Sequence, residues 1–521
     1  MKITCTLLAL LLAFSSNAQN ETAKKFAETI TAGDLKKHLY IIADPEMEGR
    51  ETGTEGQRKA AAYIENHFKS LGLKSPASLN GYQQSFNMYV DSMVSSSVTL
   101  NKKQLEWGKD YLVAANANEN GTMVGNEVVF VGYGITSKNY DDYAGLNVKG
   151  KIVAFVNGEP KKNDSVYIVS GNKQYSAEWT KTITKKLINA YSHGAKGALF
   201  INQQIQKFSA YTAEESKISR LYLPPAEKTI NGINISHAIA KSIFGIETFA
   251  AIIEKAVNLE PFSKKDYTAK KIKLEANYTE QKTTSTSTNV LGVLEGADKK
   301  DEYVFVTAHY DHLGISSTGE IYPGADDDGS GTTGLLEIAE AFAKAANAGY
   351  RPKRTIVFMT VSGEEKGLWG SEYYSNHPVF PLAKTSVDLN IDMIGRIDDT
   401  RKYGDSTNYI YVIGDDKLSS DLAPMCDSIN NTYSHMELDR KFNDPNDTHR
   451  FYYRSDHYNF AAKGVPVIFF FNGTHRDYHK PTDTPDKINY ELQEKRARFI
   501  FYMAWEAANR KKTMKRDIPL N

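Results

Sequence analysis

Apolar runs alternate with segments of helical periodicity along the C-terminal half of the chain. The runs are rich in Val, Ile and Phe and predict buried strands at 289–294, 303–308, 355–361, 387–391 and 465–471. Helical spacing of apolar residues predicts helices at 34–42, 56–71, 331–346 and 486–508. Strands that alternate with helices predict an α/β fold, in which a mostly parallel, mixed sheet has helices on both faces. Such sheets bind ligands at the carboxyl ends of their strands.

The pattern of apolar and polar residues changes at about residue 101, and the alternation of strands and helices begins after about residue 285. Between these points, short apolar runs and turns predict strands at 128–134, 151–157 and 198–202. The polar run 280–289 includes a stretch of only Thr and Ser, which is typical of a linker. We therefore expect a β-rich insert, 101–285, within an α/β domain made of residues 22–100 and 286–521.

The first 18 residues have the features of a secretory signal peptide. Lys2 supplies a positive charge, the apolar stretch Leu7–Phe14 follows, and Ser16-Asn17-Ala18 forms a small-x-small cleavage site. The alternative is a short buried helix. We expect a cleaved signal, 1–18, and a secreted or periplasmic protein. No later apolar run is long enough to cross a bilayer, so we expect no membrane span.

Size and charge narrow the classes of structure and partner. At 521 residues the chain exceeds the usual size of a single core, so two or more lobes are expected. The 63 basic and 63 acidic residues give a formal net charge of +0. This balance gives no electrostatic case for nucleic acid or an anionic membrane as partner.

Acidic and histidine residues stand where the predicted strands of the C-terminal half end. They are His309, Asp311, Glu364, Glu365 and Asp392. Carboxylate and imidazole groups are the ligands of Zn²⁺ and similar ions. Because the carboxyl ends of parallel strands meet at one edge of a sheet, these residues predict a metal-dependent hydrolase site.

The triplet Asp326-Asp327-Asp328 is the most specific single signal. Three successive acids repel one another unless a cation compensates their charge. The following glycines, Gly329 and Gly331, permit a tight turn into the next helix. One carboxylate with two oxygens could bridge two metal ions. A calcium-type loop or an acidic helix cap is the alternative for this segment.

The other candidates are weaker when each is taken alone. Taken alone, His309 and Asp311 are better explained as a surface His-Asp pair, and an exposed acidic turn is the alternative for Glu364 and Glu365. Adjacent side chains diverge, however, so one carboxylate can bind a metal ion while its neighbour acts as a general base. We expect His312 to line the pocket without binding metal, because it points the other way from His309.

Taken together, the motifs resemble those of the co-catalytic dizinc aminopeptidase family, which also includes glutamate carboxypeptidases, glutaminyl cyclases and the transferrin receptor. The matching segments are His309-Tyr310-Asp311, Gly324–Gly331, Gly363–Leu368, Asp392-Met393, Arg454–Phe460 and Tyr478–Thr484. The segment Asp142–Val153 resembles the protease-associated domain that many members insert into the peptidase lobe. The resemblance covers nearly all of the mature chain.

The resemblance implies a zinc exopeptidase fold with an inserted protease-associated domain, and two Zn²⁺ per chain. His309 and Asp392 would hold one zinc ion, and Glu365 and His479 the other. Asp327 would bridge the two ions, and its peptide bond to Asp328 would be cis.

Catalytic roles are also implied by the resemblance. Glu364 would act as general base and then as general acid, Asp311 would orient His309, and Tyr478 would donate a hydrogen bond to the developing oxyanion. Two zinc ions would activate the attacking water.

We therefore predict a secreted dizinc exopeptidase, an aminopeptidase that hydrolyses N-terminal residues from peptides. The alternatives are a carboxypeptidase or dipeptidase on the same scaffold, a glutaminyl cyclase with one zinc ion, and a receptor-like binding protein without catalysis.

Overall fold

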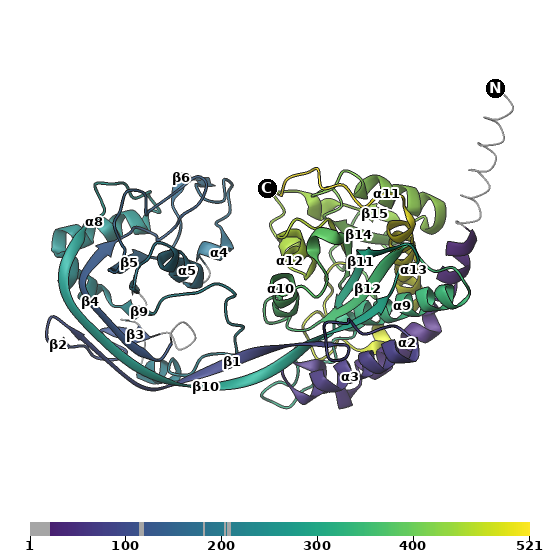
Figure 1. The fold of residues 1–521 in the computed structure, drawn as a ribbon, viewed down its shortest axis with the longest axis horizontal. Helices are drawn as coiled ribbons and strands as arrows, with labels where there is room; N and C mark the ends of the chain where they lie inside the picture. The colour runs from purple at the N-terminus through teal and green to yellow at the C-terminus, as the bar shows by residue number, and fades with distance from the viewer. Residues whose placement is uncertain (1–20, 114–118, 181–182, 203–204, 206–209, 521) are drawn as a thin grey trace, which may run out of the picture. The chain divides into compact units, whose positions relative to one another are not determined.

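The chain forms two compact units in the computed structural model, which describes residues 21–113, 119–180, 183–202, 205 and 210–520. Unit 1 takes its described residues from Met1–Asn87 and Thr286–Asn521, and unit 2 is built from Met88–Ser285 (Figure 1). The predicted signal peptide, 1–18, lies outside the described residues. Among the helices that are described, none combines the length and the apolar character that a membrane span requires.

Unit 1 is built on a mixed sheet with the strand order β15-β14-β16-β13-β11-β12-β10. Its four central strands are mutually parallel: β16 (Val467–Phe471), β13 (Thr385–Ile391), β11 (Lys299–His309) and β12 (Arg354–Val361). Two strands run antiparallel to their central neighbours: β14 (Tyr409–Ile413) and β10 (Ala269–Leu294). The short edge strand β15 (Glu437–Asp439) is parallel to β14. This mostly parallel sheet confirms the fold class predicted from the sequence.

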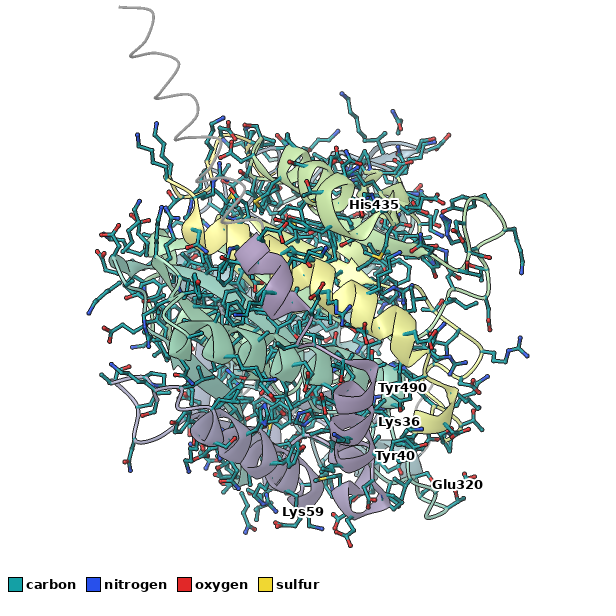
Figure 2. All side chains as sticks on the ribbon, turned by 90° about the vertical axis from the view of Figure 1, so that its right-hand side faces the viewer. Lys36, Tyr40, Lys59, Glu320, His435 and Tyr490 are labelled. Atoms are coloured by element: carbon teal, nitrogen blue, oxygen red, sulfur yellow. The ribbon has the colours of Figure 1, made fainter. Side chains whose placement is uncertain are left out.

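Helices cover both faces of the sheet in unit 1. One face carries α2 (Ala32–Ile42), α3 (Glu55–Ser70), α9 (Gly331–Asn347), α11 (Leu422–Ile429) and α13 (Tyr490–Asn509). Figure 2 shows α2, α3 and α13 on this side, with Lys36 and Tyr40 labelled on α2 and Lys59 on α3. The other face carries α10 (Trp369–Asn376) and α12 (His457–Ala461).

The central strands read as nearly continuous apolar runs because both of their faces are buried. In β11, Val304, Val306 and Ala308 pack in the core on the side of α9 and α13. Phe305 points to the opposite core, where it contacts the rings of Tyr374 and Phe460. The two-residue period of the strand therefore places one hydrophobic set on each side.

Short helical turns connect these elements in unit 1. They are η1 (Pro45–Arg50), η4 (Ala325–Ser330), η5 (Leu382–Lys384), η6 (Asn430–Ser434), η7 (Lys441–Asn443), η8 (Phe451–Tyr453) and η9 (Pro485–Lys487). The η4 turn holds the aspartate triplet and leads directly into α9, which agrees with the turn predicted there.

Unit 2 contains a second sheet region with the order β10-β4-β5-β8-β9-β3. Its strands are β1 (Gln83–Leu100), β2 (Lys103–Gln104), β3 (Tyr111–Val113), β4 (Gly121–Phe130), β5 (Ile152–Val156), β8 (Gly197–Ile201) and β9 (Gly232–Ile235), with a separate hairpin of β6 (Lys161–Asn163) and β7 (Val166–Tyr167). Its helices are α4 (Ala177–Thr180), α5 (Thr184–Ser192), α6 (Ala210–Glu215), α7 (His237–Phe244) and α8 (Ile246–Val257).

The linker expected at 280–289 is not present. These residues belong to β10, which continues from Ala269 to Leu294 and pairs with β1. Threonine is β-branched and favours extended backbone, so a Thr-rich run suits a strand as well as a loop. Polarity alone therefore misled the prediction.

Candidate metal centre

The carboxyl ends of three parallel strands lie level with one another in unit 1. His309, the last residue of β11, is in register with Val361 of β12, and the preceding Ala308 is in register with Ile391 of β13. The chain segments that leave these strands therefore start at the same edge of the sheet. Asp311, Glu364 and Asp392 follow within a few residues of those ends.

Asp327 lies at the centre of the residues that meet at this edge. Its Oδ1 atom is 3.2 Å from Nε2 of His309, and that same nitrogen is 3.6 Å from Oδ1 of Asp392. Its Oδ2 atom is 3.0 Å from Nε2 of His479, which is 3.2 Å from Oε2 of Glu365. The two oxygens of one carboxylate thus face two different donor sets. The structure brings together all five residues predicted as ligands.

Several of these buried atoms have no hydrogen-bond partner within the described part of the chain. They are Nε2 of His309, both ring nitrogens of His312, Oδ2 of Asp327 and Oε1 of Glu365. Several of them lie close to one another, such as Nδ1 of His312 and Oε1 of Glu365 at 2.8 Å, without making a hydrogen bond. Burying polar atoms in this way costs free energy unless a ligand completes them. Clustered carboxylates and imidazoles with free lone pairs fit divalent cations such as Zn²⁺.

The carboxylates also need positive charge beside them. Burial opposes ionisation of Asp327, but contacts with His309 and His479 hold the pKa of its carboxyl well below the usual range. Burial lowers the pKa of His479, and the contacts with Asp327 and Glu365 outweigh this and raise it to about 10. The centre is therefore electrostatically matched to cations.

The other two acids of the triplet anchor the loop. Asp326 accepts hydrogen bonds from the backbone N–H of Gly395 and from Nδ2 of Asn472. Asp328 accepts hydrogen bonds from the backbone N–H groups of Gly331 and Met393. The peptide bond between Asp327 and Asp328 is cis, as the resemblance implies. Of the three carboxylates, the middle one faces His309 and His479, whereas Asp326 lies against His475, whose Nε2 atom is 3.1 Å from its Oδ2 atom.

Asp311 contacts His309 mainly through its backbone. Nδ1 of His309 is 3.1 Å from the Asp311 carbonyl oxygen and 3.7 Å from the carboxylate Oδ1. The carboxylate itself accepts hydrogen bonds from the hydroxyl of Thr52 and from the backbone N–H of Glu364. Asp311 therefore ties the end of β11 to the segment that carries Glu364.

Glu364 and Tyr478, the two other predicted catalytic residues, border the cluster. Oε2 of Glu364 is 4.0 Å from Nε2 of His309. Burial raises the pKa of Glu364 well above its usual value, and the charges of nearby carboxylates add to this effect. The charge of His309 opposes it. Tyr478 stacks on the ring of His479, and burial raises the pKa of its hydroxyl, which therefore keeps its proton.

His312 lies inside the cluster, contrary to the expectation that it only lines the pocket. Its Nδ1 atom is 2.8 Å from Oε1 of Glu365 and 3.9 Å from Oδ2 of Asp327, and its side chain is fully buried. With Asp327 and Glu365 it forms a group of donors whose ligand atoms lie within 4.8 Å of one another. A second such group is formed by His309, Asp327 and Asp392.

Arg50 supports the centre and was not singled out from the sequence. Its guanidinium is fully buried and donates to the carbonyl oxygens of Tyr310, Ile42, Pro323 and Gly324. Burial lowers its pKa, while the nearby aspartates oppose this. The residue stands in a polar, Gly-containing loop, and composition alone cannot distinguish such a buried arginine from a solvated one.

The fold and the site define a protein with a centre for two neighbouring cations at the carboxyl edge of a mostly parallel sheet. Residues 289–504 match the family described as Peptidase family M28. The match confirms the resemblance of the peptidase motifs that lie within these residues.

Relatives with curated names are similar over part of their length. The chain is 36% identical over 115 residues to "Aminopeptidase YwaD" of Bacillus subtilis, which is 22% of this chain and 23% of that protein. It is 36% identical over 111 residues to a "Probable zinc metalloprotease" of Pyrenophora teres f. teres, which is 21% of this chain and 23% of the relative. The matches therefore span less than a quarter of these relatives.

Among solved structures, the chain resembles an aminopeptidase from Aneurinibacillus sp. strain AM-1. The TM-score is 0.48 and the identity 19%, with 96% of this chain and 98% of that one covered. A zinc aminopeptidase from Bacillus subtilis gives a TM-score of 0.46 and 20% identity, with 94% and 99% covered.

Proposed function

We propose that the chain is a secreted zinc aminopeptidase that removes N-terminal residues from peptides. The observation that carries this proposal is the placement of Asp327, whose two oxygens face His309 on one side and His479 on the other. A carboxylate shared in this way suits a pair of ions at a hydrolytic centre. The M28 match over 289–504 and the similarity to two relatives, an aminopeptidase and a probable zinc metalloprotease, support the activity.

The donor set assigns each ligand to one side of Asp327. His309 and Asp392 would hold one zinc ion, and Glu365 and His479 the other, with Asp327 between them. His312 contacts Glu365 on the second side and would support that ligand. When bound, zinc polarises the scissile carbonyl and lowers the pKa of a water molecule.

The protein groups then handle protons and orientation. Glu364 takes the proton of the attacking water and delivers it to the leaving amine. Its raised pKa, caused first by burial, suits a group that must hold a proton between the two steps. The protonated hydroxyl of Tyr478 donates a hydrogen bond to the oxyanion. Asp311 keeps His309 and the Glu364 segment in place.

Export and the nature of unit 2 are part of the same proposal. The features of residues 1–18 support a cleaved signal peptide and a location outside the cytoplasm. The likeness of Asp142–Val153 to the protease-associated domain supports that identity for unit 2. Within unit 2, Asp142 is buried and accepts hydrogen bonds from the backbone N–H groups of Tyr133 and Ile135, so this motif shapes a turn.

Peptides blocked at one end test the activity. We expect the zinc-loaded protein to shorten free peptides from the N-terminus and to cleave C-terminally amidated peptides, because the scissile bond adjoins a free amine. Acetylation of the N-terminus should abolish cleavage. Mass spectrometry of the products gives the end that is shortened. Cleavage of acetylated but not amidated peptides would instead show a carboxypeptidase.

Two adjacent substitutions test the roles of the residues. Glu364→Gln should retain both zinc ions of the centre around Asp327 but lose activity by about 10²–10⁴-fold or more, because it lacks the general base. Glu365→Gln is the matched control at the neighbouring position and should lose zinc as well as activity. Zinc content by plasma mass spectrometry separates the two effects. Wild-type turnover by Glu364→Gln would refute the role of Glu364.

A further inference from the structure

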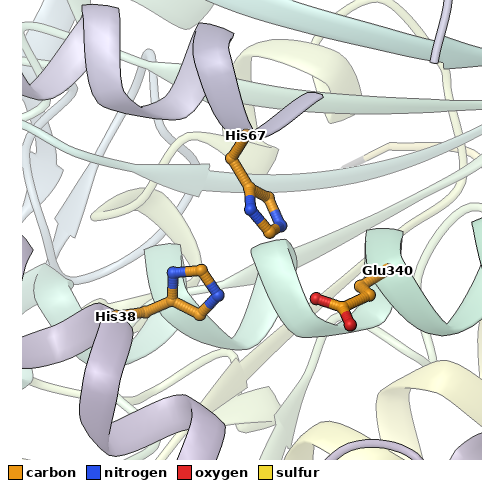
Figure 3. Close-up of side chains that lie close together, drawn as sticks. All are labelled: His38, His67 and Glu340. Atoms are coloured by element: carbon orange, nitrogen blue, oxygen red, sulfur yellow. The ribbon is translucent and has the colours of Figure 1, made fainter. Parts of the chain in front are cut away.

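Three side chains of the metal-ligand type meet outside the centre, where α2, α3 and α9 pack together in unit 1. They are His38 of α2, His67 of α3 and Glu340 of α9 (Figure 3). One ligand atom from each lies within 4.8 Å of the other two. The histidine rings are in edge contact, with centroids 4.7 Å apart. None of these residues has a part in the proposed catalysis.

One ring nitrogen of His38 contacts a residue that is not part of the cluster. Its Nδ1 atom is 2.6 Å from the hydroxyl oxygen of Tyr63, while Nε2 is 3.3 Å from Oε1 of Glu337. A histidine that binds metal through one nitrogen usually has the other fixed by a hydrogen bond, which sets the tautomer and the ring orientation. Tyr63 is placed to do this for His38, and Nε2 remains for a ligand.

His67 and Glu337 each bury an atom that lacks a hydrogen bond. Nε2 of His67 and Oε1 of Glu337 are both inaccessible to solvent and have no hydrogen-bond partner among the described residues. The Glu337 side chain is only 1% exposed. Buried polar atoms without hydrogen bonds cost free energy unless a ligand completes them.

A cation bound between these side chains would complete both atoms. We propose that His38, His67 and Glu340, with Glu337 as a fourth ligand, form a separate binding site for a zinc-type ion. Two imidazoles with carboxylates favour Zn²⁺ and its neighbours in the transition series over Ca²⁺ or Mg²⁺, which prefer oxygen ligands alone. Four protein ligands leave no open position, which is typical of a structural zinc site.

The geometry requires only a small closure of the side chains. Zinc holds its ligands at about 2.0–2.2 Å, so two ligand atoms can lie about 4.4 Å apart at most. The carboxylate of Glu340 can move, because its side chain is 26% exposed and pairs with Lys344 at the surface. The bound ion would join α2 and α3 to α9, the helix that begins directly after the aspartate triplet.

Anomalous diffraction at the zinc edge tests this site in the intact protein. Crystals grown with Zn²⁺ should give one peak between His38, His67 and Glu340, apart from the two peaks expected around Asp327. The position of the peak distinguishes this site from the catalytic centre. The two peaks around Asp327 report separately whether the catalytic centre binds zinc. A map with no peak at this position, in crystals soaked with excess Zn²⁺, would overturn the proposal.

Zinc stoichiometry in solution provides the second measurement. His67→Gln and Glu340→Gln should each lower the retained zinc from three ions per chain to two and leave peptide cleavage unchanged. His435→Asn is the control, because His435 is exposed and lies apart from α2 and α3 in Figure 2, and Asn tolerates its positive φ. Equal zinc content in the wild type and both cluster variants would contradict the site.

Discussion

At the scale of single residues, His312 shows where sequence reasoning reaches its limit. The expectation that it points away from His309 assumed that the alternation of a strand continues beyond β11. The strand ends at His309, and His312 instead forms an isolated bridge beside Glu51, in which its backbone N–H bonds to the carbonyl oxygen of Arg50. There its imidazole lies against Glu365 and Asp327. Alternation predicts direction only within a strand.

His312→Gln should therefore weaken zinc retention on the side of Glu365. Residues that support a metal ligand typically contribute about 10–100-fold in affinity, and we expect a loss in that range. The ion beside His309 should remain bound. Competition with a chelator, followed by zinc analysis, measures both sites. If both ions were retained as tightly as in the wild type, the assignment of His312 as a supporting residue would be wrong.

At the scale of elements, Arg50 joins segments that are far apart in the sequence. Its guanidinium bonds to carbonyls that follow β11 and precede η4, and to one at the end of α2. These segments carry His309 and the aspartate triplet. A rigid fork of five N–H donors can satisfy carbonyls in several directions at once. The loop at the N-terminal side thus positions ligands from the C-terminal half.

Arg50→Met should destabilise unit 1 and loosen the centre. It leaves buried carbonyl oxygens without donors, and each such atom costs about 1–3 kcal/mol, so a loss on the order of 3 kcal/mol or more is expected. Arg50→Lys keeps the positive charge but lacks the planar fork of donors. Its stability should therefore lie between those of Arg50→Met and the wild type. Urea unfolding compares the three proteins. An unchanged unfolding midpoint for Arg50→Met would exclude this role.

At the scale of the whole molecule, unit 2 has an electrostatic property of its own. Lys186 is fully buried, and its ammonium donates to the carbonyl oxygens of Tyr133 and Gly158. Burial lowers its pKa to about 7, against the opposing charges of Asp142 and Glu159. The unfolded chain binds this proton up to about pH 10.5, whereas the folded chain releases it near pH 7.

The stability of unit 2 should therefore rise with pH between about 7 and 10. In this window the unfolded state binds more protons than the folded state, and one proton contributes at most about 1.4 kcal/mol per pH unit. Lys186→Met lacks the group and should lose this slope. Urea-dependent hydrogen exchange of the β5 amides reports unit 2 at each pH. Parallel pH profiles for the variant and the wild type would show that Lys186 does not titrate in this range.

Much of the fold was predictable because it depends on local patterns. The strands that became β11, β12 and β13 are apolar on both faces, and the helix that became α9 has regular spacing, so their types follow from periodicity. β14 and α12 were not predicted, because short segments carry too few periods to be distinguished from loops. The prediction of a linker in the polar part of β10 was wrong for a related reason. Pairing with β1, which is distant in the sequence, decides the conformation of this segment.

The sequence by itself determined the α/β alternation of unit 1 and the kinds of ligand that stand at the ends of its strands. Only the tertiary structure decided that Asp327 faces His309 and His479 while Asp326 and Asp328 accept hydrogen bonds from the backbone. It also decided that His38, His67 and Glu340 meet. The periodicity of the sequence reflects interactions between residues that are close along the chain. These contacts depend instead on how distant segments pack together, and a local pattern does not specify that.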